Sequence, residues 1–432
     1  MPETDGNYDV RLARTDELDL NPESAVLPSA ASPSLAAGAA DVVSLPTYTR
    51  RTAIYDAHAA FDLVDELEHL THRSVEPNVF FSPRFLVPAM PRLDDRAVRL
   101  MVARDEDGAR SRLRFLMPFS VERTSRLGGR KAVRAWTHPF GRLGTLPLDR
   151  DDPAGTAASL FEALRAPGED LPDILVLPDL TLDGAMARVM TRAAQARALP
   201  VLVTDESDRA VLDATGDPLD FLVRTLGAKG YRDHRRRLRR LGTAGDVTFT
   251  VAQDPAETRD ALEDFLLLEA SGWKGRARSA LLADRHRVAF AREAVDGLAR
   301  QDRVRIYTLR VEGRAVASLV VLVCEGEATA WKTAYDETHR RAGPGSLVAA
   351  LASEAMVADP AIRRLDSCAM PDHRIANRLW KGRVRVGTLV IGLTPDTEHR
   401  VRQIAGDLAQ SRRRLQRRRL WRARVARLLR RT

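Results

Sequence analysis

A glycine-rich segment near residue 340 has the composition of a phosphate-binding loop. It reads Arg-Arg-Ala-Gly-Pro-Gly over residues 340–345 and fits the pattern Q/R-x-x-G-x-G/A. Glycines let the backbone turn so that consecutive N–H groups face one way, and the N-terminus of a following helix adds a positive partial charge. Two arginines would add formal charge. The sequence therefore predicts a pyrophosphate site, with a simple chain turn as the alternative. The predicted site residues are Arg340, Arg341, Gly343, Gly345 and Ser346.

Lysine is rare in this chain, yet three lysines follow a tryptophan in one C-terminal block. The chain has five lysines against 63 arginines. A strong bias toward arginine explains the scarcity of lysine but does not explain where the few lysines lie. The pairs are Trp273-Lys274, Trp331-Lys332 and Trp380-Lys381.

The second of these pairs falls in a predicted strand, where successive side chains face opposite ways. A lysine on the same face as a small alanine suggests a roomy, polar cleft wall. The alternative is that tryptophan packs in the core while lysine extends to water. The expected faces are Trp331, Thr333 and Tyr335 on one side, and Lys332, Ala334 and Asp336 on the other.

The first half of the chain alternates helical and strand patterns up to about residue 225, which is typical of an α/β fold. Residues 56–70 carry apolar side chains at a helical period, and a second helical pattern covers residues 183–199. The predicted strands are residues 97–105, 112–123, 172–180 and 200–206.

The second half begins with a basic helix over residues 231–242 and contains an antiparallel meander. Three strand patterns are joined by Glu312-Gly313 and Glu325-Gly326, which are hairpin signals. The predicted helices that follow the basic helix are residues 255–271, 284–300 and 346–357. The predicted strands are residues 247–254, 303–311, 314–324, 327–336 and 362–369.

Composition argues for a soluble, cytoplasmic protein. The first 44 residues are rich in Ala, Ser and Pro and are predicted to be disordered. The N-terminus lacks a signal-peptide pattern, and the longest apolar run, residues 315–324, is shorter than the roughly 20 residues of a membrane helix. Two cysteines indicate a reducing compartment, and no spacing typical of a metal site occurs.

The net charge of +9 is concentrated at the C-terminus. Residues 412–432 contain 11 arginines and no acid, so removing these charges leaves the rest of the chain at −2. Nucleic acid is therefore an unlikely partner for the body of the protein. Within this tail, Leu415, Trp421, Val425 and Leu428 have near-helical spacing, and a basic helix of this kind could attach the protein to the inner membrane surface. A solvated or nucleic-acid-binding tail remains open.

The order of elements over residues 231–392 resembles a GNAT acyltransferase domain. The segments LEASGWKG, GPGSL and RLDSC in that block, and NVFFSP and FLMPF in the first half, are similar to the branch linked to cellulose and exopolysaccharide synthesis. The resemblance spans roughly residues 50–395. It implies an α/β (α+β) fold of two tandem GNAT-like units, as in Fem peptidyltransferases, each with a mixed, mostly antiparallel sheet flanked by helices. The implied domains are a tail (1–44), a first unit that shapes the acceptor cleft (45–228), a cofactor-binding unit (229–398) and an Arg-rich tail (399–432).

The resemblance also implies an activity: acyl transfer, most simply acetyl, from acetyl-CoA or another acyl-CoA to an amine or hydroxyl of a sugar or polysaccharide precursor. Three alternatives remain: a degenerate GNAT scaffold in a polysaccharide synthase complex, a Fem-like aminoacyl-RNA-dependent transferase, and a membrane-surface adaptor. The implied substrate-binding residues are Trp273, Lys274, Lys332, Tyr335 and Asp336.

The proton-transfer groups depart from the family pattern. GNAT enzymes often use a tyrosine after the fifth strand as the acid, but here Trp380 stands at that position, and indole is only a hydrogen-bond donor. Acyl transfer also needs a proton acceptor. Asp366 is the first candidate, His373 the second because of its near-neutral pKa, and Glu269 the third. Covalent catalysis by Cys368 is disfavoured because no third orienting residue is evident.

Overall fold

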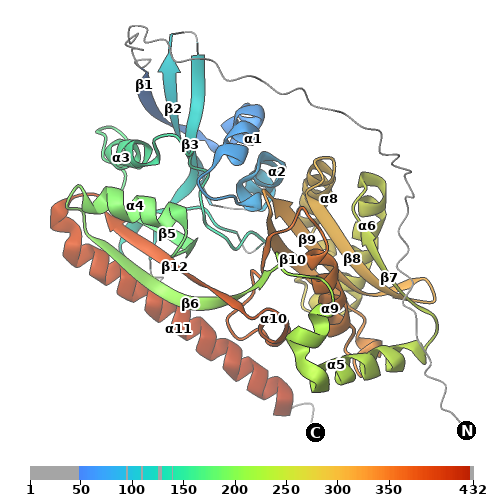
Figure 1. Cartoon of the computed structure of the whole chain (residues 1–432). Coiled ribbons are helices and arrows are strands. Elements are labelled where there is room, and N and C mark those ends of the chain that lie inside the picture. The colour runs from blue at the N-terminus through green and yellow to red at the C-terminus, as the bar shows by residue number, and fades with distance from the viewer. Residues whose placement is uncertain (1–47, 94–95, 109, 125–128, 139, 429–432) are drawn as a thin grey trace, which may run out of the picture.

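One continuous sheet of twelve strands runs through both halves of the chain (Figure 1). The computed structural model describes residues 48–93, 96–108, 110–124, 129–138 and 140–428. The predicted disordered segment 1–44 lies outside these residues. In the first half the strands are β1 (Thr49–Asp56), β2 (Arg99–Asp107), β3 (Arg110–Arg123), β4 (Lys131–Ala135), β5 (Ile174–Thr181) and β6 (Val201–Asp213). In the second half they are β7 (Val247–Ala252), β8 (Val304–Val311), β9 (Arg314–Cys324), β10 (Glu327–Tyr335), β11 (Arg364–Asp366) and β12 (Gly382–Gly392).

Helices cover both faces of this sheet. Several begin at the residues expected from capping chemistry: Asp254 and Asp284 accept backbone N–H groups at the starts of α6 and α8. In the first half the helices are α1 (Val64–Arg73), α2 (Pro83–Leu93), α3 (Pro153–Leu164) and α4 (Ala185–Gln195). In the second half they are α5 (Phe221–Gly242), α6 (Pro255–Ser271), α7 (Trp273–Arg276), α8 (Arg285–Ala299), α9 (Pro344–Val357), α10 (Arg374–Leu379) and α11 (Glu398–Leu428).

The two halves repeat one pattern of elements and exchange their last strands. The sheet order is β1-β2-β3-β4-β5-β12-β6-β11-β10-β9-β8-β7. In each half the fourth and fifth strands pair in parallel, β4 with β5 and β10 with β11. Strand β12 lies between β5 and β6, antiparallel to both, while β6 lies between β12 and β11. The predicted fold of two tandem GNAT-like units is confirmed, and the exchange joins the units into one sheet.

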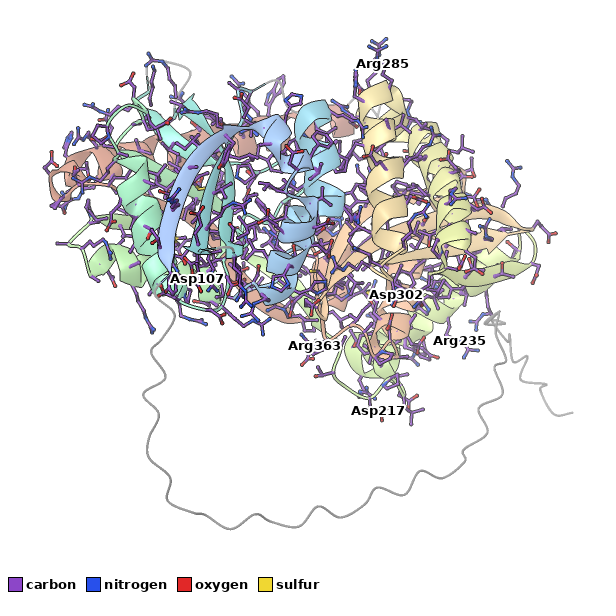
Figure 2. The ribbon with its side chains drawn as sticks, turned by 90° about the horizontal axis from the view of Figure 1, so that it is seen from above. Asp107, Asp217, Arg235, Arg285, Asp302 and Arg363 are labelled. Carbon is purple, nitrogen blue, oxygen red and sulfur yellow. The ribbon has the colours of Figure 1, made fainter. Side chains whose placement is uncertain are left out.

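Side chains of the second unit enter two cores on opposite faces of its sheet. Along β9, Val320 and Leu322 pack in the core that contains α6 and α8, whereas Leu319 and Val321 pack beneath α5 and α9. The predicted antiparallel meander is present, and its central strand is buried on both faces. Charged side chains instead project from the periphery, as Arg285 at the start of α8 and Asp217 in the turn after β6 do (Figure 2).

Helix α11 begins well before the Arg-rich segment and packs against the sheet. Val401, Ile404 and Ala405 are buried with Ile174 of β5 and Val390 of β12. In Figure 1 the helix runs diagonally beneath β6 and β12. No described helix has both the length and the apolar content needed to cross a bilayer.

The predicted helix over residues 56–70 is wrong in its first part. Asp56 ends β1, residues 57–61 form a 3-10 turn, and α1 begins only at Val64. Strand β1 pairs with β2 along its whole length, from Thr49 opposite Glu106 to Asp56 opposite Arg99. Sheet pairing thus takes only Asp56 out of the predicted helix, and a 3-10 turn replaces the helix at the residues that follow it. Strands β4 and β12 were also absent from the predicted set.

The strand exchange predicts that the first half does not fold alone. Residues 48–217 expressed separately would leave β5 and β6 without β12 between them. We expect this fragment to lack a cooperative thermal transition by circular dichroism, and co-expression with residues 218–432 to give a soluble complex that copurifies. A cooperative melt of residues 48–217 alone would contradict the expectation.

Candidate functional site

Strands β10 and β11 separate soon after they pair. Strand β11 has only three residues, which pair with Glu327, Ala328 and Thr329 of β10. Beyond Thr329 the two strands diverge, and the chain turns after Asp366 through Cys368, whose φ is 44°. Strand β10 also has a register shift against β9 between Ala330 and Lys332. Diverging strands and a bulge leave backbone groups without sheet partners, so this split is a natural place for a ligand.

The bulge changes which way the tryptophan of β10 faces. Trp331 packs with the same core as Ala334, and its ring meets Phe85 and Phe290 at centroid distances of 6.1 and 6.2 Å. The prediction of strict alternation is therefore wrong for Trp331. A bulge opposes two residues to one on the partner strand and so shifts the side-chain pattern. Lys332, the next residue, places its ammonium 4.4 Å from the ring centre of Phe140.

Two of the three lysines that follow tryptophan converge on one buried carboxylate. Glu269 is buried, and its Oε1 accepts from Lys274 Nζ at 2.9 Å and from Lys332 Nζ at 3.3 Å. Its Oε2 accepts the backbone N–H of Leu281 at 2.8 Å. The structure thus brings together Glu269, Lys274 and Lys332. Lys381, the third of these lysines, is exposed.

Burial and pairing oppose one another in this cluster. Burial alone would raise the pKa of Glu269, but the charges of Lys332 and Lys274 outweigh it and hold that pKa below its usual value. Burial lowers the pKa of Lys332 to about 8, although Glu269 opposes the shift. At neutral pH Glu269 is therefore a carboxylate and Lys332 is an ammonium group.

The glycine loop contains one residue in the left-handed region, directly before α9. Gly343 has φ 69° and ψ 53°, a left-handed conformation, and it caps α9 with Pro344 as the next residue. A Cβ atom on Gly343 would lie 2.9 Å from Arg237 Nη1, and one on Gly345 would lie 3.1 Å from Cδ1 of Tyr335. Glycine is thus favoured by backbone angle at one position and by close packing at the other.

A wide groove of about 1030 Å³ borders this loop. Arg340 and Arg341 line it together with Asp336, and α6 forms part of its wall. Trp273 is exposed and donates its backbone N–H to Glu337, another residue of the groove wall, at 2.9 Å. Of the predicted site residues, Trp273, Tyr335 and Asp336 therefore lie close to the glycine loop. The further arginines that line the groove are Arg276, Arg310 and Arg314.

The other predicted catalytic residues lie in separate hydrogen-bond networks. Asp366 is buried, its Oδ2 lies 3.3 Å from Arg209 Nη1, and its Oδ1 accepts the N–H of Cys368 at 2.7 Å. His373 caps α10, where its Nδ1 accepts the N–H of Ala376 at 3.2 Å. Burial raises the pKa of the Cys368 thiol, which keeps it protonated. The three candidate proton acceptors therefore do not form one relay.

Residues that the sequence analysis did not single out fill the far end of the split. They lie in the β4 loop, residues 136–152. Its Phe140 accepts the indole N–H of Trp331 at 2.8 Å and lies beneath the ammonium of Lys332. Arg142 accepts, through its backbone oxygen, a hydrogen bond of 3.1 Å from Arg209 Nη2. These residues are distant in sequence from the glycine loop, and nothing in their local pattern marks them.

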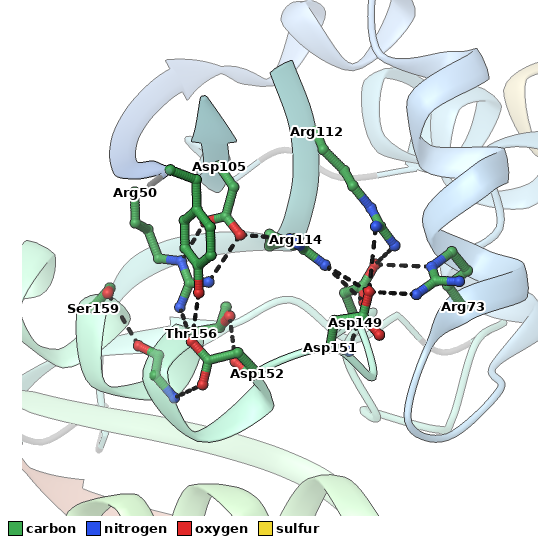
Figure 3. Close-up of polar contacts among 12 residues, drawn as sticks. Arg50, Arg73, Asp105, Arg112, Arg114, Asp149, Asp151, Asp152, Thr156 and Ser159 are labelled. Carbon is green, nitrogen blue, oxygen red and sulfur yellow. Dashed lines mark hydrogen bonds and ion pairs between the residues drawn. The ribbon is translucent and has the colours of Figure 1, made fainter. Parts of the chain in front are cut away.

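The first unit has an acidic helix start where the second has its glycine loop. Asp152 caps α3 by accepting the N–H of Gly155 at 2.9 Å, and it pairs with Arg50 Nη1 at 2.9 Å. Figure 3 shows the wider network of these charges, in which each carboxylate meets an arginine. A carboxylate at this helix start would repel a phosphate, so the second unit is the better candidate for a phosphate ligand. The network residues are Arg50, Arg73, Arg112, Arg114, Asp105, Asp149, Asp151 and Asp152.

Across the described part of the chain, no group of three or more His, Cys, Asp or Glu side chains is placed to hold a metal ion. The charged side chains at the split and in the groove are instead mainly arginines and lysines. Both carry positive charge and suit anionic ligands.

Comparison with known proteins agrees with the fold. Residues 228–382 match the family model described as an acetyltransferase (GNAT) domain. Among curated proteins none matches the chain. The crystal structure of FemX is similar at 9% identity and a TM-score of 0.51, covering 79% of this chain and 98% of FemX. A conserved protein of unknown function from Bacteroides thetaiotaomicron gives 13% identity and a TM-score of 0.48, over 77% of this chain and 97% of that one. The family match supports an acyltransferase with a GNAT domain in its second half.

The lysine cluster yields a prediction for stability against pH. Lys332 has a folded pKa of about 8 against an ordinary 10.5, so between these values the unfolded chain binds more protons and the contribution of this residue to stability rises with pH. We expect wild type to gain stability relative to Lys332→Met across that window, by on the order of 3 kcal/mol at most. Urea unfolding at several pH values measures it, with exposed Lys381→Met as the control. Parallel stability curves for wild type and Lys332→Met would contradict the burial argument.

Proposed function

We propose that the protein transfers an acyl group, most simply acetyl, from an acyl-coenzyme A to an amine or hydroxyl of a sugar-related acceptor. One observation carries this proposal. Within the segment that matches the acetyltransferase (GNAT) domain, the glycine loop at the start of α9 follows β10, the strand that diverges from β11. Such an arrangement offers a place for a pyrophosphate at the loop and for an extended chain along the split.

The loop residues fit the pyrophosphate of coenzyme A. The helix start carries positive partial charge, Arg340 and Arg341 are exposed beside it, and Ser346 lies in the first turn of α9. Gly343 has a left-handed angle, and Gly345 is buried against Tyr335, where a side chain would be crowded. Bound acyl-coenzyme A would supply an activated thioester carbonyl and a thiol leaving group.

Asp366 is our candidate for accepting the proton of the acceptor nucleophile. It ends β11 beside the turn of residues 367–371 and pairs with one arginine, Arg209, whereas Glu269 is held by two lysines and His373 caps a helix. The position at which related enzymes carry a tyrosine acid is filled by Trp380, which is buried and donates its indole N–H to Ser353 Oγ at 2.9 Å. The leaving thiol would therefore take its proton from another group or from water.

The predicted substrate-binding residues fall into two groups in the structure. Trp273, Tyr335 and Asp336 lie close to the glycine loop and suit the donor. Lys274 and Lys332 hold α6 and α7 against β10 through Glu269, and Lys332 reaches Phe140 of the first half. We assign this lysine cluster to the wall between donor and acceptor.

A Fem-like transferase with an RNA-borne donor is the second candidate. The basic helix α5 favours it, because Arg237 lies near Gly343 and Arg240 donates to the backbone oxygen of Arg341 at 3.2 Å. A donor attached to RNA could contact this helix as well as the loop. Calorimetry with acyl-coenzyme A and with RNA separates the two candidates.

Gly343→Ala tests the donor site. Alanine in a left-handed conformation costs about 1 to 2 kcal/mol and would disturb the loop. We expect the affinity for acetyl-coenzyme A, measured by calorimetry, to fall about tenfold or more. Gly108→Ala is the matched control, since Gly108 also has a positive φ, 53°, in an open turn with nothing within 4 Å of the added Cβ. Equal affinities in the two variants would remove the donor assignment.

Asp366→Asn tests the proton acceptor. The amide oxygen can still accept from Cys368 N–H, while the carboxylate is lost. We expect turnover to fall on the order of 10²-fold with unchanged acetyl-coenzyme A affinity. Asp372→Asn, an exposed position in the same loop, should turn over as wild type does. Thermal melts establish that each variant is folded at the assay temperature. Full activity of folded Asp366→Asn would exclude Asp366 as the base.

A further inference from the structure

A small cavity lies where the two halves of the chain meet, and it belongs to neither the glycine loop nor the lysine cluster. Its volume is about 270 Å³. Six separate segments line it: the β4 loop, β5, β6, the turn after β11, β12 and α11. We call it the arginine cavity. Its lining residues that matter here are Arg142, Asp179, Arg209, Met370 and Arg412.

Arg209 is fixed at the wall of this cavity. It is buried, its Nη1 pairs with Asp366 and contacts Cys368 Sγ at 3.6 Å, and its Nη2 donates to the backbone oxygen of Arg142. Burying a guanidinium is costly unless hydrogen bonds and an opposite charge compensate, and Asp366 provides that charge. The planar group is therefore held in one orientation beside the cavity.

Arg142 and Arg412 bring further positive charge from two other elements. Arg142 Nη1 donates to Met370 Sδ at 3.2 Å, and a thioether is a weak acceptor. Arg412 donates to Ser207 Oγ at 3.1 Å and to the backbone oxygen of Asp205. Both sets of acceptors are neutral atoms. Three guanidinium groups thus line the cavity together with the carboxylate of Asp179, while Asp366 pairs with Arg209 and Asp205 lies near Arg412 behind the wall.

The cavity lies at the end of the split between β10 and β11. The β4 loop separates the two features: Phe140 contacts Trp331 and Lys332 of β10, and Arg142, two residues later, lines the cavity. The opposite wall is formed by residues 368–371, which follow β11 directly. A ligand in the cavity would therefore lie beyond the diverging end of the two strands.

We propose that the arginine cavity binds an anionic group, a carboxylate or a phosphate, carried by the acceptor. Guanidinium groups match both kinds of oxyanion through paired N–H donors. Asp179 would accept a hydrogen bond from a neighbouring hydroxyl or amine of the same molecule. The volume lies below the usual range of about 300 to 1,000 Å³ for ligand pockets, so one charged sugar-sized group enters rather than an oligosaccharide. The role as acceptor rests on the proposed acyl transfer.

The proposal gives the start of the Arg-rich tail a place in the site. Arg412 is the first residue of the segment 412–432, which contains 11 arginines, and it lines the cavity, whereas Arg413, the next residue of α11, is exposed. Two adjacent arginines on one helix thus differ in their surroundings and not in their chemistry. They form a matched pair for substitution.

Binding of small sugars to the full-length protein tests the cavity directly. The probes are D-glucuronate, D-glucose 6-phosphate and neutral D-glucose, titrated at low salt by calorimetry. We expect at least one of the two anions to bind saturably and about tenfold or more tighter than glucose. The anion that binds tighter identifies the acceptor group as a carboxylate or a phosphate. Failure of both anions to bind better than glucose would overturn the proposal.

Substitutions of single arginines test whether the anion binds in the arginine cavity. Arg142→Met and Arg412→Met should each weaken the preferred anion about tenfold, and Arg413→Met should change its affinity less than about twofold. Arg209 is left intact because its removal would strand the buried carboxylate of Asp366. Thermal melts control for folding. Wild-type affinity in either Arg142→Met or Arg412→Met, or an equal loss in Arg413→Met, would overturn the assignment to this cavity.

Parallel measurements with acetyl-coenzyme A separate this inference from the proposed function. Anion binding that depends on Arg142 and Arg412, in a protein that does not bind acetyl-coenzyme A, would uphold the cavity and refute acyl transfer. Thiol release with a neutral acceptor, unaffected by Arg412→Met, would uphold acyl transfer and refute the anionic acceptor.

Discussion

Strands β6 and β12 run side by side at the centre of the sheet, and each lies next to the other half of the chain. Strand β6 is the last strand of the first unit but pairs with β11 of the second, while β12 is the last strand of the second unit and pairs with β5 of the first. This exchange sets the rest of the architecture. Because β6 borders β11, Arg209 reaches Asp366, and because β5 borders β12, Asp179 lies in the same cavity wall as Val386 and Gly387. The junction between the halves is therefore part of the sheet and not a mobile hinge.

The placement of lysine in an arginine-rich chain follows from the geometry of two charge clusters. In the first unit Arg50 binds both oxygens of Asp105 at 2.7 and 3.0 Å, a pairing that needs a planar fork. At Glu269 a single oxygen accepts from both Lys274 and Lys332. Two compact ammonium groups fit around one oxygen, and lysine tolerates a lowered pKa when it is buried, whereas arginine keeps its charge. Lysine is thus the side chain that this buried wall can accommodate.

The sequence predicted those elements whose pattern is local. The helices α6 and α8 and the meander β8 to β10 were predicted from local sequence patterns and hairpin signals, and Gly343 adopts a conformation that favours glycine. Strands β1 and β12 were missed because their strand character depends on partners far away in sequence. The same dependence on distant partners explains why the arginine cavity was not predicted. Glu269 and the lysines lie in one block of the sequence. Arg142, Arg209 and Arg412 meet only through the strand exchange and the packing of α11.

The difference between the two repeated units then explains how one site can be built from both. The start of α3 carries Asp152 and neighbours an arginine–carboxylate network, so its charges are already matched within the first unit. The start of α9 has glycines and exposed arginines instead. With its own helix start closed to phosphate, the first unit contributes the β4 loop, which touches β10 through Phe140 and lines the arginine cavity through Arg142. A donor along the split and an acceptor in the cavity would therefore share one wall, and that wall comes from the unit that has no glycine loop at its helix start.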